Sequence, residues 1–231
     1  MSAGPKASVL ITGASGNVGQ AIARELAPKV RLALFDRRAS ALGDLPNASE
    51  HQSYGGVDLN DEPRVASAVG DVSARLGSIR ALVHTVGGWA GGTDVRDQGT
   101  DLVRRMLEIN YLSAVTIVRA VLPGMLSAGG GTIVLFGSAD ALKGRAGSSA
   151  YAASKGALLR FSESLAEEVG SGGIRVRVIL PTTIDTEINR KAMPNARFSD
   201  WVTPEQIARS VSFLIDDASD GIRYATVPMG R

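Results

Sequence analysis

Thr12-Gly13-Ala14-Ser15-Gly16-Asn17-Val18-Gly19 follows the short apolar run Ser8–Thr12 and leads directly into Val18–Ala27, a segment of helical period. The glycines permit a tight turn, a close approach of the backbone to a diphosphate, and close packing of the helix on the strand. N–H groups at the start of such a helix attract an anion. The stretch predicts a phosphate site between a first strand and a first helix, although an ordinary turn would use the same glycines.

Short apolar runs alternate with helical segments along the chain. The expected strands are Ser8–Thr12, Val30–Asp36, Ser53–Val57, Ala81–Thr85, Thr132–Phe136, Ile174–Leu180 and Ile222–Val227. The expected helices are Val18–Ala27, Glu62–Leu76, Asp101–Leu126, Ser149–Val169 and Thr203–Ile215. This order predicts a doubly wound α/β fold: a single Rossmann-type domain over residues 1–231, with a mainly parallel seven-stranded sheet flanked by helices. The irregular stretch 182–201 is expected to act as a substrate lid.

The composition excludes several classes of protein. The chain has no cysteine and only two distant histidines, His51 and His84, so we expect neither a disulfide nor a metal site. A net charge of +2 without a run of basic residues argues against a nucleic-acid partner. Residues 1–6 lack a signal-peptide pattern, and glycines interrupt the longest uncharged stretch, 120–139. We therefore expect no membrane segment and a cytoplasmic location.

Asp36 ends the second expected strand, at the carboxyl edge of the sheet where ligands of such folds bind. A carboxylate there accepts hydrogen bonds from the hydroxyls of an adenosine ribose and repels a 2′-phosphate, which favours NAD(H). Arg37 and Arg38 follow immediately, and guanidinium groups suit phosphate, so NADP(H) stays open. The two arginines would also fit a solvated turn.

Tyr151 and Lys155 lie at the start of an expected helix, and a spacing of four residues places the two side chains on one face. A phenol is a poor acid–base group at neutral pH, because its ordinary pKa is about 10. A cation nearby stabilises the phenolate and lowers that pKa toward the working range. The pair indicates acid–base chemistry, although an ordinary amphipathic helix would also contain it.

Together these motifs resemble the short-chain dehydrogenase/reductase family over essentially the whole chain, because the glycine loop, Asp36, Asp58, Gly87, Asn110, Ser138, Tyr151, Lys155 and the 181–186 turn occur in the family's order. The resemblance implies an NAD(P)-dependent oxidoreductase acting on a carbonyl or alcohol. Tyr151 would transfer the proton, and Lys155 would bind the nicotinamide ribose and lower the pKa of the tyrosine. Ser138 would hydrogen-bond the substrate oxygen. Asn110 would help to hold a water molecule in a proton relay.

The resemblance also implies the residues that bind the dinucleotide. They are Gly13, Ser15, Gly16, Asn17, Val18, Gly19, Asp36, Arg37, Asp58, Leu59, Val86, Gly87, Tyr151, Lys155, Pro181, Thr183, Ile184 and Thr186. Each polar residue has a purely structural alternative. Ser138 would serve as a cap, Asn110 as an internal hydrogen-bonding group of its helix, and Asp58 as the N-cap of the helix that follows.

Three segments depart from the family's pattern. Asn17 stands where the family has the second glycine of the loop, and asparagine tolerates the left-handed backbone that this position would need. The family's Asn-Asn-Ala-Gly is His84-Thr85-Val86-Gly87 here, and we expect His84 to be a packed side chain at a strand end rather than a base. The usual Pro-Gly after the sixth strand is Pro181-Thr182.

Two segments resemble one branch of the family, the dihydropteridine reductases: 86–92, which contains Trp89, and 180–201, which contains Met193 and Trp201. The two tryptophans, with Ala139 and Met193, would line a pocket for a flat substrate, or would merely pack the lid. The complete set of Asn110, Ser138, Tyr151 and Lys155 favours a carbon–oxygen centre instead. A dihydropteridine reductase-like enzyme stays an alternative, as does a catalytically idle NAD(P)-binding sensor or scaffold. Relatives usually assemble through the helices expected at 101–126 and 149–169, so we expect a homodimer or homotetramer.

Overall fold

β1 (Ser8–Thr12) is buried along its whole length, because helices cover both faces of the sheet that it joins. In the computed structural model, which describes residues 7–38 and 45–230, seven strands form one parallel sheet in the order β3-β2-β1-β4-β5-β6-β7. The other strands are β2 (Arg31–Phe35), β3 (Gln52–Tyr54), β4 (Ile79–His84), β5 (Gly131–Phe136), β6 (Ile174–Pro181) and β7 (Tyr224–Met229). The predicted doubly wound α/β fold is confirmed.

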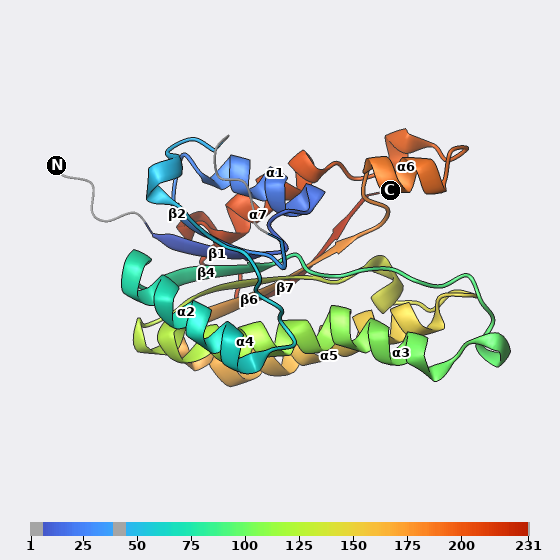
Figure 1. Cartoon of the computed structure of the whole chain (residues 1–231), viewed down its shortest axis with the longest axis horizontal. Helices are drawn as coiled ribbons and strands as arrows, with labels where there is room; N and C mark the ends of the chain where they lie inside the picture. Colours follow the sequence, from blue (N-terminus) through green and yellow to red (C-terminus); the bar gives the residue numbers. More distant parts are fainter. Residues whose placement is uncertain (1–6, 39–44, 231) are drawn as a thin grey trace.

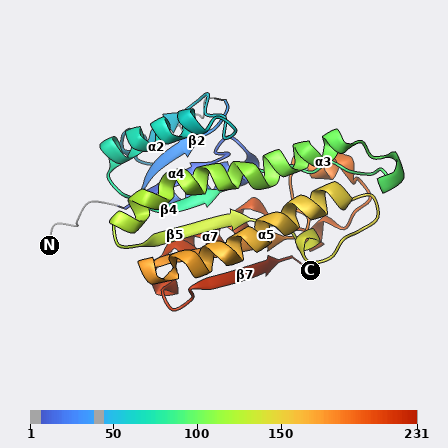
Figure 2. The ribbon, with the colours of Figure 1, turned by 90° about the horizontal axis from the view of Figure 1, so that it is seen from below.

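The helices form two layers around the sheet, as Figure 1 and Figure 2 show. α1 (Asn17–Leu26) and α7 (Pro204–Ile215) pack on one face, whereas α2 (Glu62–Leu76), α4 (Ser113–Ser127) and α5 (Ser149–Val169) pack on the other. Successive strand residues point to opposite layers. In β1, Val9 and Ile11 join the core beneath α1 and α7, and Leu10 joins the opposite core. Burial on both faces explains why the strands are apolar throughout.

The long helix predicted at Asp101–Leu126 is interrupted near its middle. α3 (Thr100–Leu107) passes through a π-helical turn at Glu108–Leu112 into α4. The N–H of Ser113 therefore donates to the carbonyl oxygen of Glu108, five residues earlier. Such single π turns are rare and occur mostly at functional sites. Asn110 lies within this one.

Several other boundaries differ from the predicted ones. β3 ends at Tyr54 rather than Val57, because Gly56 adopts a φ of +71° and turns the chain. β7 begins at Tyr224, and Ile222, predicted to start it, lies outside the strand and is 38% exposed. The stretch 182–201, predicted as irregular, contains the short helix α6 (Glu187–Ala192).

One helical stretch among the described residues, Thr100–Ser127, is long and apolar enough by composition to cross a membrane, and 39% of its most apolar window is buried. Ile117, Val118 and Val121 of this stretch belong to the core between α4 and the sheet. Packing in the fold therefore accounts for the buried part of its apolar composition.

Candidate active site

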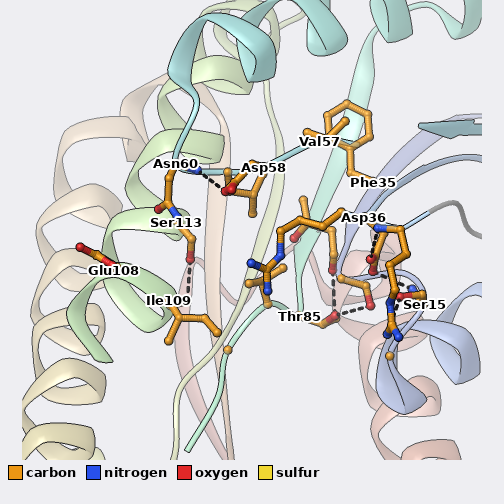
Figure 3. Close-up of a pocket in the computed structure, with 18 of the residues that line it drawn as sticks. Ser15, Phe35, Asp36, Val57, Asp58, Asn60, Thr85, Glu108, Ile109 and Ser113 are labelled. Atoms are coloured by element: carbon orange, nitrogen blue, oxygen red, sulfur yellow. Dashed lines mark hydrogen bonds between the residues drawn. The ribbon is translucent and has the colours of Figure 1, made fainter. Parts of the chain in front are cut away.

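The carboxyl ends of β1, β2 and β4 surround a cavity of about 760 Å³ (Figure 3). Its lining residues are Thr12, Gly13, Ser15, Gly16, Phe35, Asp36, Arg37, Arg38, Val57, Asp58, Leu59, Asn60, Thr85, Val86, Gly87, Arg105, Glu108, Ile109 and Ser113. Nine of the residues predicted to bind the dinucleotide are among them: Gly13, Ser15, Gly16, Asp36, Arg37, Asp58, Leu59, Val86 and Gly87. The cavity thus lies where open α/β sheets bind their ligands.

The glycine loop is shaped by contacts that leave no room for side chains. Gly13 has a φ of +72°, and a Cβ atom there would lie 2.7 Å from Oγ1 of Thr85. A Cβ atom on Gly19 would overlap the carbonyl oxygen of Gly13. Asn17 is the first residue of α1, and among the described non-glycine residues only Asn47 has a positive φ. The expectation of a left-handed backbone at Asn17 is therefore wrong, because Asn17 already belongs to the first turn of the helix.

Asp36 is hydrogen-bonded to the glycine loop. Its carboxylate accepts hydrogen bonds from the backbone N–H of Ser15 at 3.0 Å and that of Arg38 at 2.9 Å. Partial burial raises the pKa of Asp36, but hydrogen bonds from the Ser15 side chain and from the Arg38 and Ser15 amides outweigh it and hold that pKa below its usual range. The carboxylate is therefore charged at neutral pH and has lone pairs left for further donors.

Asp58 and Leu59 close the cavity beside Val57. The carboxylate of Asp58 accepts a hydrogen bond from the backbone N–H of Asn60 at 2.9 Å. Asp58 is not the N-cap of α2, because Asp61 occupies that position and accepts from the N–H of Arg64. Leu59 is 6% exposed and belongs to the core.

Tyr151 and Ser138 meet where α5 begins beside the end of β5. The Ser138 hydroxyl accepts from the N–H of Asp140 at 3.2 Å and lies near enough to the Tyr151 phenol to lower its pKa. Ser138 therefore caps a short 3-10 turn, which was its predicted structural alternative, and also lies beside the tyrosine. Burial raises the pKa of Tyr151; the Ser138 hydroxyl opposes this, and the Asp140 charge adds to it. At neutral pH the phenol keeps its proton.

Lys155 lies one helical turn beyond Tyr151 and is 4% exposed. Its Nζ donates to the carbonyl oxygen of Phe136 at 2.6 Å, and burial lowers its pKa to about 8. A Cβ atom on Gly87 would lie 2.9 Å from Oδ1 of Asn110 and 3.1 Å from Nζ of Lys155. The bare backbone of Gly87 therefore brings the loop after β4 against both side chains. The charge of Lys155 is not among the influences that shift the pKa of Tyr151.

Asn110 is fully buried in the π turn and is paired with the loop after β4. Its Oδ1 accepts from the N–H of Gly88, and its Nδ2 donates to the carbonyl oxygen of the same residue, both at 2.9 Å. Nδ2 also lies 3.1 Å from Oγ of Ser154 on α5. The side chain thus joins three segments, and its Nδ2 also lies 3.8 Å from Sδ of Met106, one turn earlier in its own helix.

The two histidines are both buried. His84 is 1% exposed at the end of β4, and burial, followed by the charge of Lys155, lowers its pKa to about 3. This agrees with a packed, neutral side chain at a strand end. His51 is 2% exposed, accepts from the N–H of Leu32 at 3.2 Å, and lies 2.9 Å from the carbonyl oxygen of Pro46. Among the described residues no group of three or more His, Cys, Asp or Glu side chains could hold a metal ion.

The stretch after β6 folds back along the edge of the sheet. Pro181 ends β6, and Thr183 accepts a hydrogen bond from the N–H of Val202 at 3.0 Å. Ile184 forms an isolated parallel bridge with Val202. The hydroxyl of Thr186 caps α6 by accepting from the N–H of Asn189. Pro181, Thr183, Ile184 and Thr186 do not line the cavity described above, and neither do Asn17, Val18 and Gly19 in the first turn of α1.

The four residues predicted for the substrate pocket lie on separate segments. Trp89 is 62% exposed on the loop after β4, and Ala139 begins the turn after Ser138. Met193 is 40% exposed at the end of α6. The ring of Trp201 packs 4.8 Å from that of Phe198, which in turn lies beneath the guanidinium of Arg190. Trp201 therefore packs within the stretch 182–201, and none of the four residues lines the cavity.

Sequence reasoning missed the wall of the cavity that α3, the π turn and α4 supply. Arg105, Ile109 and Ser113 line it together with Glu108. The first three are spaced four residues apart, a spacing that predicts a shared helix face. In this segment the motifs had pointed to Asn110 alone.

Comparison with known proteins agrees with this geometry. The family model for short chain dehydrogenases matches residues 7–197. Human 3-oxoacyl-[acyl-carrier-protein] reductase is 32% identical over 219 residues, covering 89% of this chain and 90% of the relative. Carbonyl reductase family member 4 of Xenopus laevis is 32% identical over 216 residues, covering 89% of each. A structure of NAD⁺-bound xylitol dehydrogenase superimposes with a TM-score of 0.86 at 25% identity, covering 97% of each chain. The chain belongs to the short-chain dehydrogenase/reductase family. It is an oxidoreductase with a nucleotide-binding Rossmann fold.

Proposed function

We propose that this protein is an NAD(H)-dependent enzyme that reduces a carbonyl group to an alcohol. The observation that carries the proposal is the placing of the Tyr151 phenol beside the Ser138 hydroxyl, next to Lys155 and at the same sheet edge as the cavity. A protonated phenol beside a hydroxyl is suited to receive a substrate oxygen. Two relatives are named as a 3-oxoacyl reductase and a carbonyl reductase, which supports a carbon–oxygen centre.

The residues around the cavity fit a nicotinamide dinucleotide. The glycine loop, which has no space for a Cβ atom at Gly13 or Gly19, would hold the diphosphate at the start of α1. Asp36 would bind the adenosine ribose, and Asp58 with Leu59 would border the adenine. Val86 and Gly87 would contact the cofactor from the loop after β4, and Lys155 and Tyr151 would bind the nicotinamide ribose. Pro181, Thr183, Ile184 and Thr186 would border the carboxamide. When bound, the dinucleotide supplies the hydride.

In the proposed reduction, the Tyr151 O–H donates its proton to the substrate oxygen as the carbonyl carbon gains the hydride. The product is the alcohol, and a phenolate is left on Tyr151. Ser138 donates a hydrogen bond to the same oxygen and stabilises its developing charge. Lys155 would hold the nicotinamide ribose beside the phenolate until solvent returns a proton. Asn110 holds the backbone of Gly88, and so keeps the loop after β4 against the site.

Two features support NAD(H) over NADP(H). Asp36 is charged and lies at the ribose end of the cavity, where a 2′-phosphate would be repelled. Its position is set by the Ser15 and Arg38 amides, so it cannot turn away without losing two hydrogen bonds. Arg37 and Arg38 line the same end, and they are the groups that would accept NADPH if the carboxylate were absent.

The test is oxidation of NADH and of NADPH with a panel of ketones, quinones and a quinonoid dihydropterin. The variant is Tyr151→Phe, and the matched control is Tyr224→Phe, which removes a phenol hydroxyl from the edge strand β7. We expect ketone turnover with NADH that Tyr151→Phe abolishes and Tyr224→Phe retains. Turnover of the dihydropterin alone would favour the dihydropteridine reductase-like alternative. Dinucleotide binding without any turnover would favour the sensor.

We also propose that the protein is a homodimer or homotetramer that assembles through α3, α4 and α5. Leu112 and Leu126 are 46% and 44% exposed at the two ends of α4, on the outer layer of the fold. A contact through these helices would cover both side chains. Light scattering after size exclusion measures the mass, and a monomer at micromolar concentration would contradict the proposal.

A further inference from the structure

His84 has no part in the proposed reaction, yet both of its ring nitrogens are engaged. Nδ1 lies 2.8 Å from Oγ1 of Thr12, and Nε2 lies 3.4 Å from Oγ of Ser113. The Ser113 hydroxyl donates its own proton to the carbonyl oxygen of Ile109 at 2.7 Å (Figure 3). It can therefore only accept from Nε2–H, and Nδ1 accepts from the hydroxyl of Thr12. The hydrogen bonds fix one tautomer.

The imidazole suits this arrangement because it stays neutral. Burial and the charge of Lys155 keep the pKa of His84 near 3, so the ring offers one donor and one acceptor at any pH at which an enzyme of this kind works. A protonated ring would present two donors, and the hydroxyl of Thr12 would then lose its acceptor.

The two ends of this hydrogen-bonded chain lie at different parts of the candidate site. Thr12 is the residue before Gly13, and its carbonyl oxygen accepts the hydroxyl of Thr85 at 2.7 Å. Ser113 is the first residue of α4, and its N–H bonds to Glu108 across the π turn. The hydroxyl of Ser113 bonds Ile109 within that turn, one residue before Asn110. This series of hydrogen bonds therefore runs from the phosphate loop to the π turn.

We propose that His84 is a positioning residue, whose ring joins Thr12 at the phosphate loop to Ser113 at the π turn and so holds Asn110 against Gly88. The inference rests on the proposed function for the importance of Asn110 to turnover, but not for the mechanical link itself. The π turn is the element that would relax if the link were removed, because a regular helix is the more stable alternative.

Four variants separate the two halves of the link. His84→Phe keeps a flat ring and removes both hydrogen bonds. The amide of His84→Asn reaches the place of Nδ1, because both groups are two bonds from Cβ. The amide of His84→Gln reaches the place of Nε2, because both groups are three bonds from Cβ. Ser113→Ala removes the far partner. The matched control is His51→Phe, since His51 is equally buried and has a partner at each ring nitrogen, but lies at the amino end of β3.

The first measurement is amide hydrogen exchange over residues 108–114, made without dinucleotide and relative to each variant's global stability. We expect about fivefold faster exchange in His84→Phe, His84→Asn and Ser113→Ala, a smaller increase in His84→Gln, which keeps only the Ser113 half of the link, and little change in His51→Phe. The double variant His84→Phe/Ser113→Ala should exchange no faster than either single variant, because both break one link. Unchanged exchange in His84→Phe, additive effects, or an equal effect of His51→Phe would each overturn the proposal.

The second measurement is steady-state kinetics with the best ketone substrate. We expect kcat to fall about tenfold in His84→Phe and Ser113→Ala, with the KM for the ketone little changed. His84→Gln, which keeps only the Ser113 half of the link, should retain part of the kcat that His84→Phe loses. Exchange that responds as expected while kcat does not would show that the link exists and that the role assigned to Asn110 is wrong. If no substrate is turned over at all, the exchange result alone decides whether His84 positions the turn.

Discussion

The ammonium of Lys155 lies 2.6 Å from the carbonyl oxygen of Phe136 and is buried, and within the described part of the chain no carboxylate forms an ion pair with it. A single carbonyl dipole compensates only part of the loss of water around a charge. This cation is held at the site at the expense of stability, and its cost is measurable.

Lys155→Met should therefore stabilise the protein while it abolishes turnover. The pKa of Lys155 is about 8 in the folded protein against an ordinary value of 10.5, so between these values the unfolded chain binds a proton that the folded protein does not. The free energy of unfolding therefore rises with pH between these two values. The destabilisation caused by the buried charge is full below about pH 8 and absent above about pH 10.5. In urea unfolding at pH 7, the free energy of unfolding of Lys155→Met should exceed that of the unaltered protein by about 1–3 kcal/mol. The difference should be smaller at pH 10. An equal or lower stability of the variant at pH 7 would contradict this account.

The rate of carbonyl reduction should fall as the pH rises above about 8. Lys155 then loses the charge with which it would bind the nicotinamide ribose, and its folded pKa of about 8 places the change there. The raised pKa of Tyr151 keeps the proton donor in place over the same range. The measurement is kcat against pH from 6 to 10 at saturating substrate. A rate that stays constant to pH 10 would show that the charge of Lys155 is not used.

Asp36→Asn should move the cofactor preference toward NADPH. The amide keeps an acceptor for the N–H of Ser15 but removes the charge that repels a 2′-phosphate, and Arg37 and Arg38 then become available to it. We expect the ratio of kcat/KM for NADPH to that for NADH to rise by at least about tenfold, and Arg37→Ala in the same background to reverse most of the gain. A ratio that does not move would place the ribose elsewhere.

Stability should depend on pH through His84. Its folded pKa of about 3 lies below the ordinary value of 6.5, so the unfolded chain takes up a proton that the folded protein does not. This contribution is fully present above about pH 6.5 and is lost as the pH falls toward 3, by at most about 1.4 kcal/mol per pH unit. His84→Gln cannot titrate, so its stability deficit relative to the unaltered protein should narrow on acidification from pH 7 to pH 4.5. A constant deficit would mean that His84 titrates normally.

Arg190→Gln should weaken substrate binding with little effect on stability. Arg190 pairs with Asp185 through two hydrogen bonds at 2.6 and 2.7 Å and covers the ring of Phe198, which packs on Trp201. The Arg190 side chain is half exposed, so its replacement should move the melting temperature only slightly. If 182–201 is the lid, the KM for the ketone should rise several-fold. Lys191→Gln, which breaks an exposed pair with Glu187 on the same helix, is the control and should leave KM unchanged.

The parts of the site that sequence predicted are those defined by local spacing. Tyr151 and Lys155 occupy successive turns of one helix, and Gly13 to Gly19 occupy one turn between a strand and a helix. The face formed by Arg105, Ile109 and Ser113 was equally readable, but the π turn among them was not. The π turn of this chain contacts a residue far from it in the sequence, since Ser113 is bonded to His84, and no local pattern predicts such a contact.

The sequence by itself determined the order of strands and helices and the edge of the sheet at which chemistry-bearing residues gather, because hydrophobic period and glycine spacing act over a few neighbouring residues. Only the tertiary structure decided which of these residues meet. It paired Asn110 with Gly88 and His84 with Thr12, and it gave Trp201 a partner in Phe198. The contact of Asn110 with Gly88 joins residues 22 positions apart, and that of His84 with Thr12 joins residues 72 positions apart. Both depend on the register of neighbouring strands and on the paths of the loops that leave them.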